Sequence, residues 1–98
     1  LMMVAGATGP AEAARLRATS GDALFLVPGY GAQGAGARES MAGFVQRAGG
    51  LEGGVVNASR SVATPESARG AANIRDWERA IDFAITAAQA ELVEAARA

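Results

Sequence analysis

Three residue types that carry much of protein chemistry are missing from this sequence of 98 residues, which has no cysteine, no histidine and no lysine. The lack of cysteine excludes disulfides, thiolate nucleophiles and zinc–thiolate clusters. The lack of histidine removes the commonest general base and the commonest transition-metal ligand. Proton transfer is left to Asp, Glu and Tyr, so an enzyme containing this sequence is expected to carry much of its chemistry on residues outside it.

Surplus charge and long apolar runs are also lacking. The formal net charge is −1, and without a basic surplus we expect no nucleic-acid partner. No apolar run approaches the length of a membrane span, and nothing in the sequence marks it for export. We therefore expect no membrane partner and a cytoplasmic location. Half of the residues are hydrophobic, which is enough for a folded core.

The sequence begins inside an apolar run, "LMMVAGA", at Leu1. Buried strands seldom begin at a free, charged amine. We therefore expect the chain to be a fragment of a larger protein.

Three short apolar runs predict strands: "LMMVAGA" (1–7), "ALFLVPG" (23–29) and "GGVVNAS" (53–59). None of them alternates polar with apolar residues, which is typical of strands in a parallel sheet that is covered on both faces. Helical segments separate them. Pro10 and Gly21 mark the start and stop of one, and a second is predicted over 37–50. The order β-α-β-α-β-α indicates an α/β fold with right-handed crossovers.

Two of the predicted helices have an apolar face at helical spacing. In the second helix, which is expected to end at Gly49, the face consists of Met41, Phe44, Val45 and Ala48. A long last helix is predicted from about Ile74. Its stripe, which we expect to lie on the sheet, comprises Ile74, Trp77, Ile81, Ala84, Ile85, Ala88 and Leu92. Phe83 falls on the opposite side.

Two architectures compete for this pattern: an open doubly wound sheet and a slice of a (β/α)8 barrel. The first would make the chain a small Rossmann-like NAD(P)-binding module, since Gly29-x-Gly31-x-x-Gly34 follows a strand. That motif requires a helix to begin within the glycines so that its N-terminus faces the pyrophosphate. Here residues 34–37 continue as a glycine-rich loop, and Pro28 interrupts the strand-to-turn path.

The barrel interpretation explains more of the loops. In (β/α)8 enzymes the active site lies at the C-terminal ends of the strands, and the loops after strands seven and eight often bind phosphate. If the three strands are the last three, "PGYGAQG" follows strand seven and "NASRS" ends strand eight. Glycine amides, the Gln33 amide and the Arg60 guanidinium are suited to a phosphate dianion.

At these residues the sequence resembles a known family. The segments "VAGATGP", "FLVPGYGAQG" and "GGVVNASRSV", in this order and spacing, are similar to the C-terminal part of orotidine 5′-phosphate decarboxylase, in particular its larger bacterial form. The resemblance extends over nearly the whole chain. It implies that residues 1–98 are strands six to eight, with their helices, of a single (β/α)8 TIM-barrel domain.

The resemblance also implies a function. The family converts orotidine 5′-monophosphate to UMP and CO2 in de novo pyrimidine biosynthesis, without metal or organic cofactor, and commonly as a homodimer. Its loop glutamine and strand-eight arginine, which bind the substrate's phosphate, correspond to Gln33 and Arg60. Ser59 would lie beside the phosphate, and backbone at Pro28, Gly29 and Tyr30 would border pyrimidine and ribose. The family more often has Val or Ile at the position of Tyr30.

The full set of substrate-binding residues predicted here is Pro28, Gly29, Tyr30, Gly31, Gln33, Gly34, Ser59 and Arg60. No catalytic residue is predicted in this chain. The family's catalytic group is an Asp-x-Lys-x-x-Asp motif with a further lysine, and this sequence has no lysine. The remaining barrel segment would therefore be needed for decarboxylation.

Overall fold

The structure contains a three-stranded parallel sheet, as the apolar runs predict. The computed structural model describes residues 2–31 and 35–97. The strands are β1 (Met2–Val4), β2 (Leu24–Val27) and β5 (Gly54–Val56), in the order β1-β2-β5. Each strand lies within its predicted segment but is shorter. The loops begin at Ala5, Pro28 and Asn57.

The first helix, α1 (Pro10–Ser20), also agrees with its predicted bounds. Pro10 occupies the first turn, where its missing N–H is not required, and Gly21 ends the helix with φ 59°. Ala13 of α1 is buried against the sheet, and Leu16 packs beside it. This helix covers one face of the sheet.

The second predicted helix is wrong beyond its first turn. Only α2 (Ala37–Ser40) is helical, and it is followed by an antiparallel hairpin of β3 (Val45–Arg47) and β4 (Gly50–Glu52). Gly43 explains the break, because a Cβ there would lie 2.8 Å from ring carbons of Phe25, so the backbone itself packs on the core. Gly50, with φ 119°, permits the hairpin turn. The expected helical face of Met41, Phe44, Val45 and Ala48 does not form.

The predicted long C-terminal helix is present as α4 (Ile74–Arg97). Asn73 caps its first turn, since the Asn73 Oδ1 accepts the backbone N–H of Asp76 at 2.9 Å. Before it come η1 (Ser59–Ala63), a single π-helical turn, and α3 (Glu66–Arg69). In the part of the chain that the structure describes, no helix is both long and apolar enough to cross a membrane.

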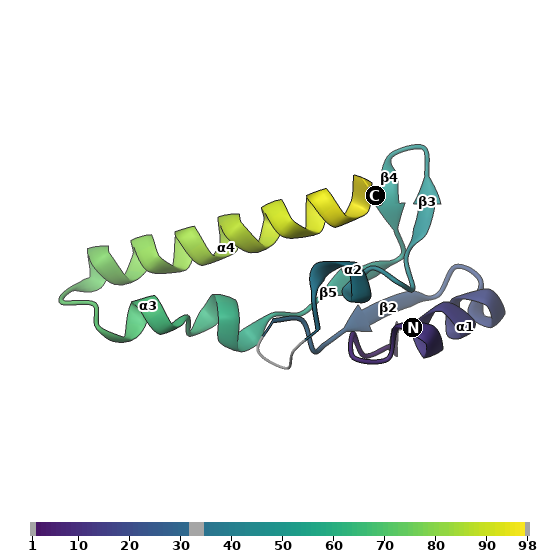
Figure 1. Cartoon of the computed structure of the whole chain (residues 1–98), viewed down its shortest axis with the longest axis horizontal. Coiled ribbons are helices and arrows are strands. Elements are labelled where there is room, and N and C mark those ends of the chain that lie inside the picture. The colour runs from purple at the N-terminus through teal and green to yellow at the C-terminus, as the bar shows by residue number, and fades with distance from the viewer. Residues whose placement is uncertain (1, 32–34, 98) are drawn as a thin grey trace.

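The α4 helix packs on α2, η1 and α3 rather than mainly on the strands (Figure 1). Its predicted stripe is therefore only partly covered. Ile81, Ala84, Ala88 and Leu92 are half-buried, whereas Ile74 and Trp77 at the start of the helix are 75% and 47% exposed. Phe83 is exposed, on the side opposite the stripe as predicted.

The two faces of the sheet differ sharply in burial. Phe25 and Val27 point to the side covered by α1 and are buried. Register places Val4, Leu26 and Val55 side by side on the other face. There Val4 is 67% exposed and Val55 is 51% exposed. The expectation that both faces are covered is therefore not met within this chain.

Arg17 connects the segments at the N-terminal end of the sheet. Its guanidinium lies 4.0 Å from the centroid of the buried Phe25 ring and donates to four backbone carbonyls, those of Gly21, Ala23, Gly43 and Gly53, at 2.6–2.8 Å. These carbonyls belong to the end of α1, the start of β2, the segment before the hairpin, and the start of β5. One side chain thus fixes where two neighbouring strands begin.

Replacing Arg17 with Met should lower the free energy of unfolding by about 2–4 kcal/mol, because partly buried carbonyls lose their donors. Denaturant unfolding followed by circular dichroism measures this change. Arg15→Met, at an exposed position on the same helix, is the matched control and should change stability by less than about 0.5 kcal/mol. Equal losses in the two variants would contradict the role assigned to Arg17.

Candidate functional site

The C-terminal ends of β2 and β5 bring two loops to one edge of the sheet. Val27 pairs with Val56 in the parallel ladder, and the Asn57 N–H donates to the Val27 carbonyl at 2.9 Å. The segment 28–31 follows β2, and η1 follows β5 after two residues. Predicted site residues from both segments therefore lie at the same edge, as parallel topology requires.

The loop after β2 is closed by its own backbone. Tyr30 forms a bridge with Ala35, where the Gly31 N–H donates to the Ala35 carbonyl at 2.9 Å and the Ala35 N–H donates to the Gly29 carbonyl at 3.3 Å. Gly29 and Gly31 have φ of 102° and 78°, a region that favours glycine. The Gly31 amide is consequently occupied within the loop and is not available to a ligand in this conformation.

The predicted residues of the β5 side lie in η1. Ser59 and Arg60 are both exposed, and the Ser59 hydroxyl accepts from the Asn57 side-chain amide at 3.4 Å. Within residues 2–31 and 35–97, the Arg60 guanidinium makes no hydrogen bond or ion pair. Gln33 and Gly34, predicted on the β2 side, lie outside the described residues. The structure thus places Pro28, Gly29, Tyr30 and Gly31 at the same edge of the sheet as Ser59 and Arg60. The two segments approach each other at Gly31 and Ser61.

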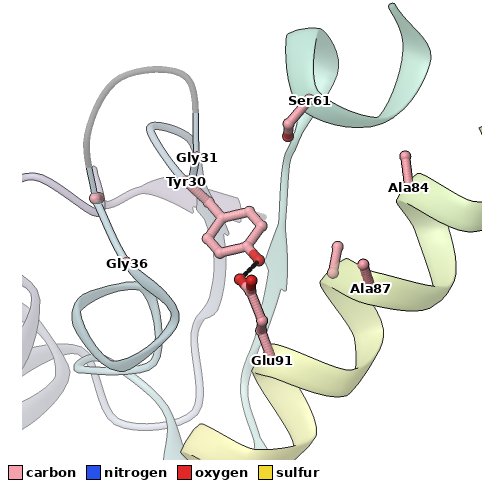
Figure 2. A pocket seen from close by; sticks show the side chains of 9 residues that line it. Tyr30, Gly31, Gly36, Ser61, Ala84, Ala87 and Glu91 are labelled. Atoms are coloured by element: carbon pink, nitrogen blue, oxygen red, sulfur yellow. Dashed lines mark hydrogen bonds between the residues drawn. The ribbon is translucent and has the colours of Figure 1, made fainter. Parts of the chain in front are cut away.

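Tyr30 points away from solvent and towards α4. The side chain is 7% exposed, and its hydroxyl donates to the Glu91 carboxylate (Figure 2). Burial, with the hydrogen bond and negative charge of Glu91 adding to it, raises the pKa of Tyr30 to about 12. Tyr30 therefore stays protonated at neutral pH and serves as a hydrogen-bond donor, not as a base.

Sequence reasoning did not identify Glu91. A partial signal was present, because Ala84, Ala88 and Glu91 follow one another at helical spacing along α4. A carboxylate that continues such a row of small residues is a candidate to contact a segment that packs on the same side of the helix. Which partner it has cannot be read from the row itself, since Tyr30 is distant in sequence.

A hollow of about 420 Å³ lies between the loop that follows β2, η1 and α4 (Figure 2). We call residues 28–31 of this loop the β2 loop. Small residues leave this space open. Its lining includes Tyr30, Gly31, Gly36, Ser61, Ala84 and Glu91. The Ser61 Oγ is buried without a hydrogen-bond partner among the described residues, and a Cβ at Gly31 would lie 3.0 Å from that oxygen. The two loops therefore approach each other closely, and Gly31 allows the approach.

The described residues offer little for metal or dinucleotide chemistry. They contain no cluster of three or more acidic side chains that could hold a metal ion. The α2 helix starts at Ala37, three residues beyond the last glycine of Gly29-x-Gly31-x-x-Gly34, and has one turn only. No helix N-terminus therefore faces the glycine motif, and the NAD(P)-binding alternative is not favoured.

The ionisation of Tyr30 gives a direct test of the Tyr30–Glu91 contact, because Tyr30 is the one tyrosine of the sequence. We expect tyrosinate absorbance to appear near pH 12. Since the folded-state pKa lies above the ordinary value of about 10, the stabilisation is present below about pH 10 and is lost as pH rises through about 12.

Glu91→Ala should lower the pKa of Tyr30 towards about 10 without reaching it, since burial is the largest cause of the shift. Glu94→Ala, an exposed glutamate on the same helix, should leave the titration unchanged. A Tyr30 pKa near 10 in the unaltered chain would contradict the contact.

Comparison with known proteins identifies similar sequences of one kind. The chain is 46% identical over 61 residues to orotidine 5′-phosphate decarboxylase of Azoarcus sp., a match that covers 61% of this chain and 22% of that protein. It is 46% identical over 59 residues to the decarboxylase of Clostridium tetani, covering 60% and 19%. The relative from Leptothrix cholodnii is 46% identical over 65 residues, covering 63% and 23%.

Other comparisons add no further relatives. No family model matches the chain, and no solved structure matches it. The chain spans about a fifth of the length of the curated relatives it matches. The similarity covers about 60% of the chain, less than the nearly complete coverage expected. Over that part, the predicted resemblance is confirmed: the chain is similar to a segment of the orotidine 5′-phosphate decarboxylases.

Proposed function

We propose that this chain is part of an orotidine 5′-phosphate decarboxylase, which converts orotidine 5′-monophosphate to UMP and CO2 in de novo pyrimidine biosynthesis. In this proposal the chain supplies the loops that bind the substrate's phosphate. The observation that carries it is the juxtaposition of the β2 loop with η1 at the C-terminal edge of neighbouring parallel strands. The similarity to named decarboxylases supports the same assignment.

The sheet supports a place within a TIM barrel. In such a barrel one face of each strand is covered by helices and the other fills the interior. Here α1 covers one face, and the opposite face exposes apolar Met2, Val4, Leu24 and Val55. We propose that β1, β2 and β5 are strands six, seven and eight of one (β/α)8 domain. The remaining strands would then close the barrel over these side chains.

Arg60 is the main candidate to bind the phosphate. Its guanidinium is exposed and makes no ion pair with the residues the structure describes, so its donors are available to a dianion. It stands on η1, which begins two residues after β5 ends. Gln33 and Gly34 would bind from the β2 loop, with Ser59 beside Arg60. Pro28, Gly29, Tyr30 and Gly31 would shape the border of the nucleoside.

The proposed site binds substrate but does not perform the chemical step. The sequence contains no lysine, and in this family a lysine delivers the proton that replaces CO2. That group would come from the rest of the barrel, with no cofactor required, in a cytoplasmic homodimer. Phosphate contacts still contribute to rate, because binding energy from a group remote from the reaction can be used to organise the reacting centre.

In the complete enzyme, Arg60→Ala should lower kcat/KM for orotidine 5′-monophosphate roughly 10- to 100-fold, the loss expected for charged hydrogen bonds of about 1.5–3 kcal/mol. The phosphate-free nucleoside orotidine should react as before. Arg75→Ala, an exposed arginine on α4, is the control and should affect neither substrate. An equal loss on both substrates would rule out a phosphate role for Arg60.

The 98-residue chain by itself should not decarboxylate orotidine 5′-monophosphate, because the lysine that supplies the proton is missing. Joining it to the N-terminal portion of the Azoarcus relative should restore product formation, measured by the loss of substrate absorbance. Activity of the chain alone would refute this division. A melting-temperature increase with NAD or NADP would instead favour a dinucleotide-binding module.

A further inference from the structure

The β2 loop and α4 are joined by one side-chain contact. The hydroxyl of Tyr30 donates to the carboxylate of Glu91, 61 positions further along the chain. Among the described residues, this is the one hydrogen bond between α4 and any segment of the sheet or its loops. In the described part of the chain, the polar contact between the β2 loop and α4 is therefore the hydrogen bond of Tyr30 with Glu91 (Figure 2).

Tyr30 is well placed to control the loop because of its neighbours. It stands between Gly29 and Gly31, both with positive φ, and glycine restricts backbone conformation less than any other residue. Tyr30 carries the side chain of this three-residue segment, and its ring is buried. Backbone hydrogen bonds between Gly29, Gly31 and Ala35 close the loop, and the Tyr30 side chain adds the contact that joins it to α4.

The same helix supports the segment that carries Arg60. The α4 and η1 elements pack together, and Val62 of η1 lines a cavity of about 190 Å³ together with Tyr30 and Leu92 of α4. Gly31 of the β2 loop also lies close to Ser61 of η1. One helix therefore contacts both segments of the proposed phosphate site, by packing on one side and by the Tyr30–Glu91 hydrogen bond on the other.

We infer that Glu91 is a positioning residue for the proposed phosphate site, holding the β2 loop through Tyr30 at a fixed distance from Arg60. The inference rests on the proposed function. Glu91 touches no substrate in this assignment; it acts through the Tyr30 hydroxyl. A hydrogen bond from a neutral hydroxyl to a carboxylate is stronger than one between neutral groups, and loss of the carboxylate leaves a buried hydroxyl unpaired.

The test uses Tyr30→Phe, Glu91→Ala and the double variant in the complete enzyme. Each single variant should raise KM for orotidine 5′-monophosphate roughly 3- to 10-fold, as expected for the loss of one hydrogen bond. For each variant the loss on phosphate-free orotidine should be smaller than the loss on orotidine 5′-monophosphate, because orotidine makes no phosphate contacts. The double variant should lose no more than either single variant, because both remove the same contact.

Two further variants separate positioning from a general loss of structure. Glu91→Gln keeps a hydrogen-bond acceptor and should retain a KM within about twofold of the unaltered enzyme, since the Tyr30 hydroxyl stays paired. Glu94→Ala removes an exposed glutamate from the same helix and should have no effect. Equal losses on both substrates, or additive losses in the double variant, would overturn the inference.

Arg60→Ala, measured alongside, distinguishes the two levels of the proposal. If Arg60→Ala selectively impairs the phosphorylated substrate and the Tyr30 and Glu91 variants do not, the positioning role of Glu91 is wrong while the proposed phosphate site stands. If Arg60→Ala shows no selectivity, the phosphate site is wrong, and the positioning role falls with it.

Discussion

The guanidinium of Arg17 is the interaction on which the arrangement of the sheet depends. It binds carbonyls at the end of α1 and at the starts of β2 and β5, through Gly21, Ala23 and Gly53. Parallel strands have no tight hairpin to set their register. The hydrogen bonds of Arg17 to the residues that precede β2 and β5 help to set the register of these two strands instead. Because these strands are only three or four residues long, fixing their starts also fixes where their opposite ends deliver the β2 loop and η1.

The opposite end of the sheet has no residue that makes as many hydrogen bonds as Arg17 among the described residues. There the β2 loop has glycines on both sides of Tyr30, and no cluster of hydrogen bonds comparable to those of Arg17 holds it within the described residues. Two hydrogen bonds join it to segments outside the loop that follows β2: the Ala7 N–H donates to the Pro28 carbonyl at 2.8 Å, and the Tyr30 hydroxyl donates to Glu91. Under the proposed function, this loop would border the substrate, while Arg17 fixes the strands at their opposite ends.

Sequence patterns predicted the elements whose formation depends on residues close together in the sequence. Apolar runs located the three strands, and Pro10 and Gly21 located α1. The segment after α2 was mispredicted because the spacing of its apolar residues satisfies a helix, while the close approach of Gly43 to Phe25, a tertiary event, stops it. Glu91 was missed for a similar reason: its partner is 61 residues away, and no local pattern encodes that pairing. Parallel topology did predict the common edge of Tyr30 and Arg60.

Under the proposed function, the exposed face of the sheet and the lack of lysine have one explanation. Val4 and Val55 expose apolar surface, and burial of such surface is favourable by about 25 cal/mol per Å². The sequence has an arginine suited to a phosphate but no lysine to deliver a proton. In the proposed barrel, the other strands would cover the apolar face and would also supply the proton donor.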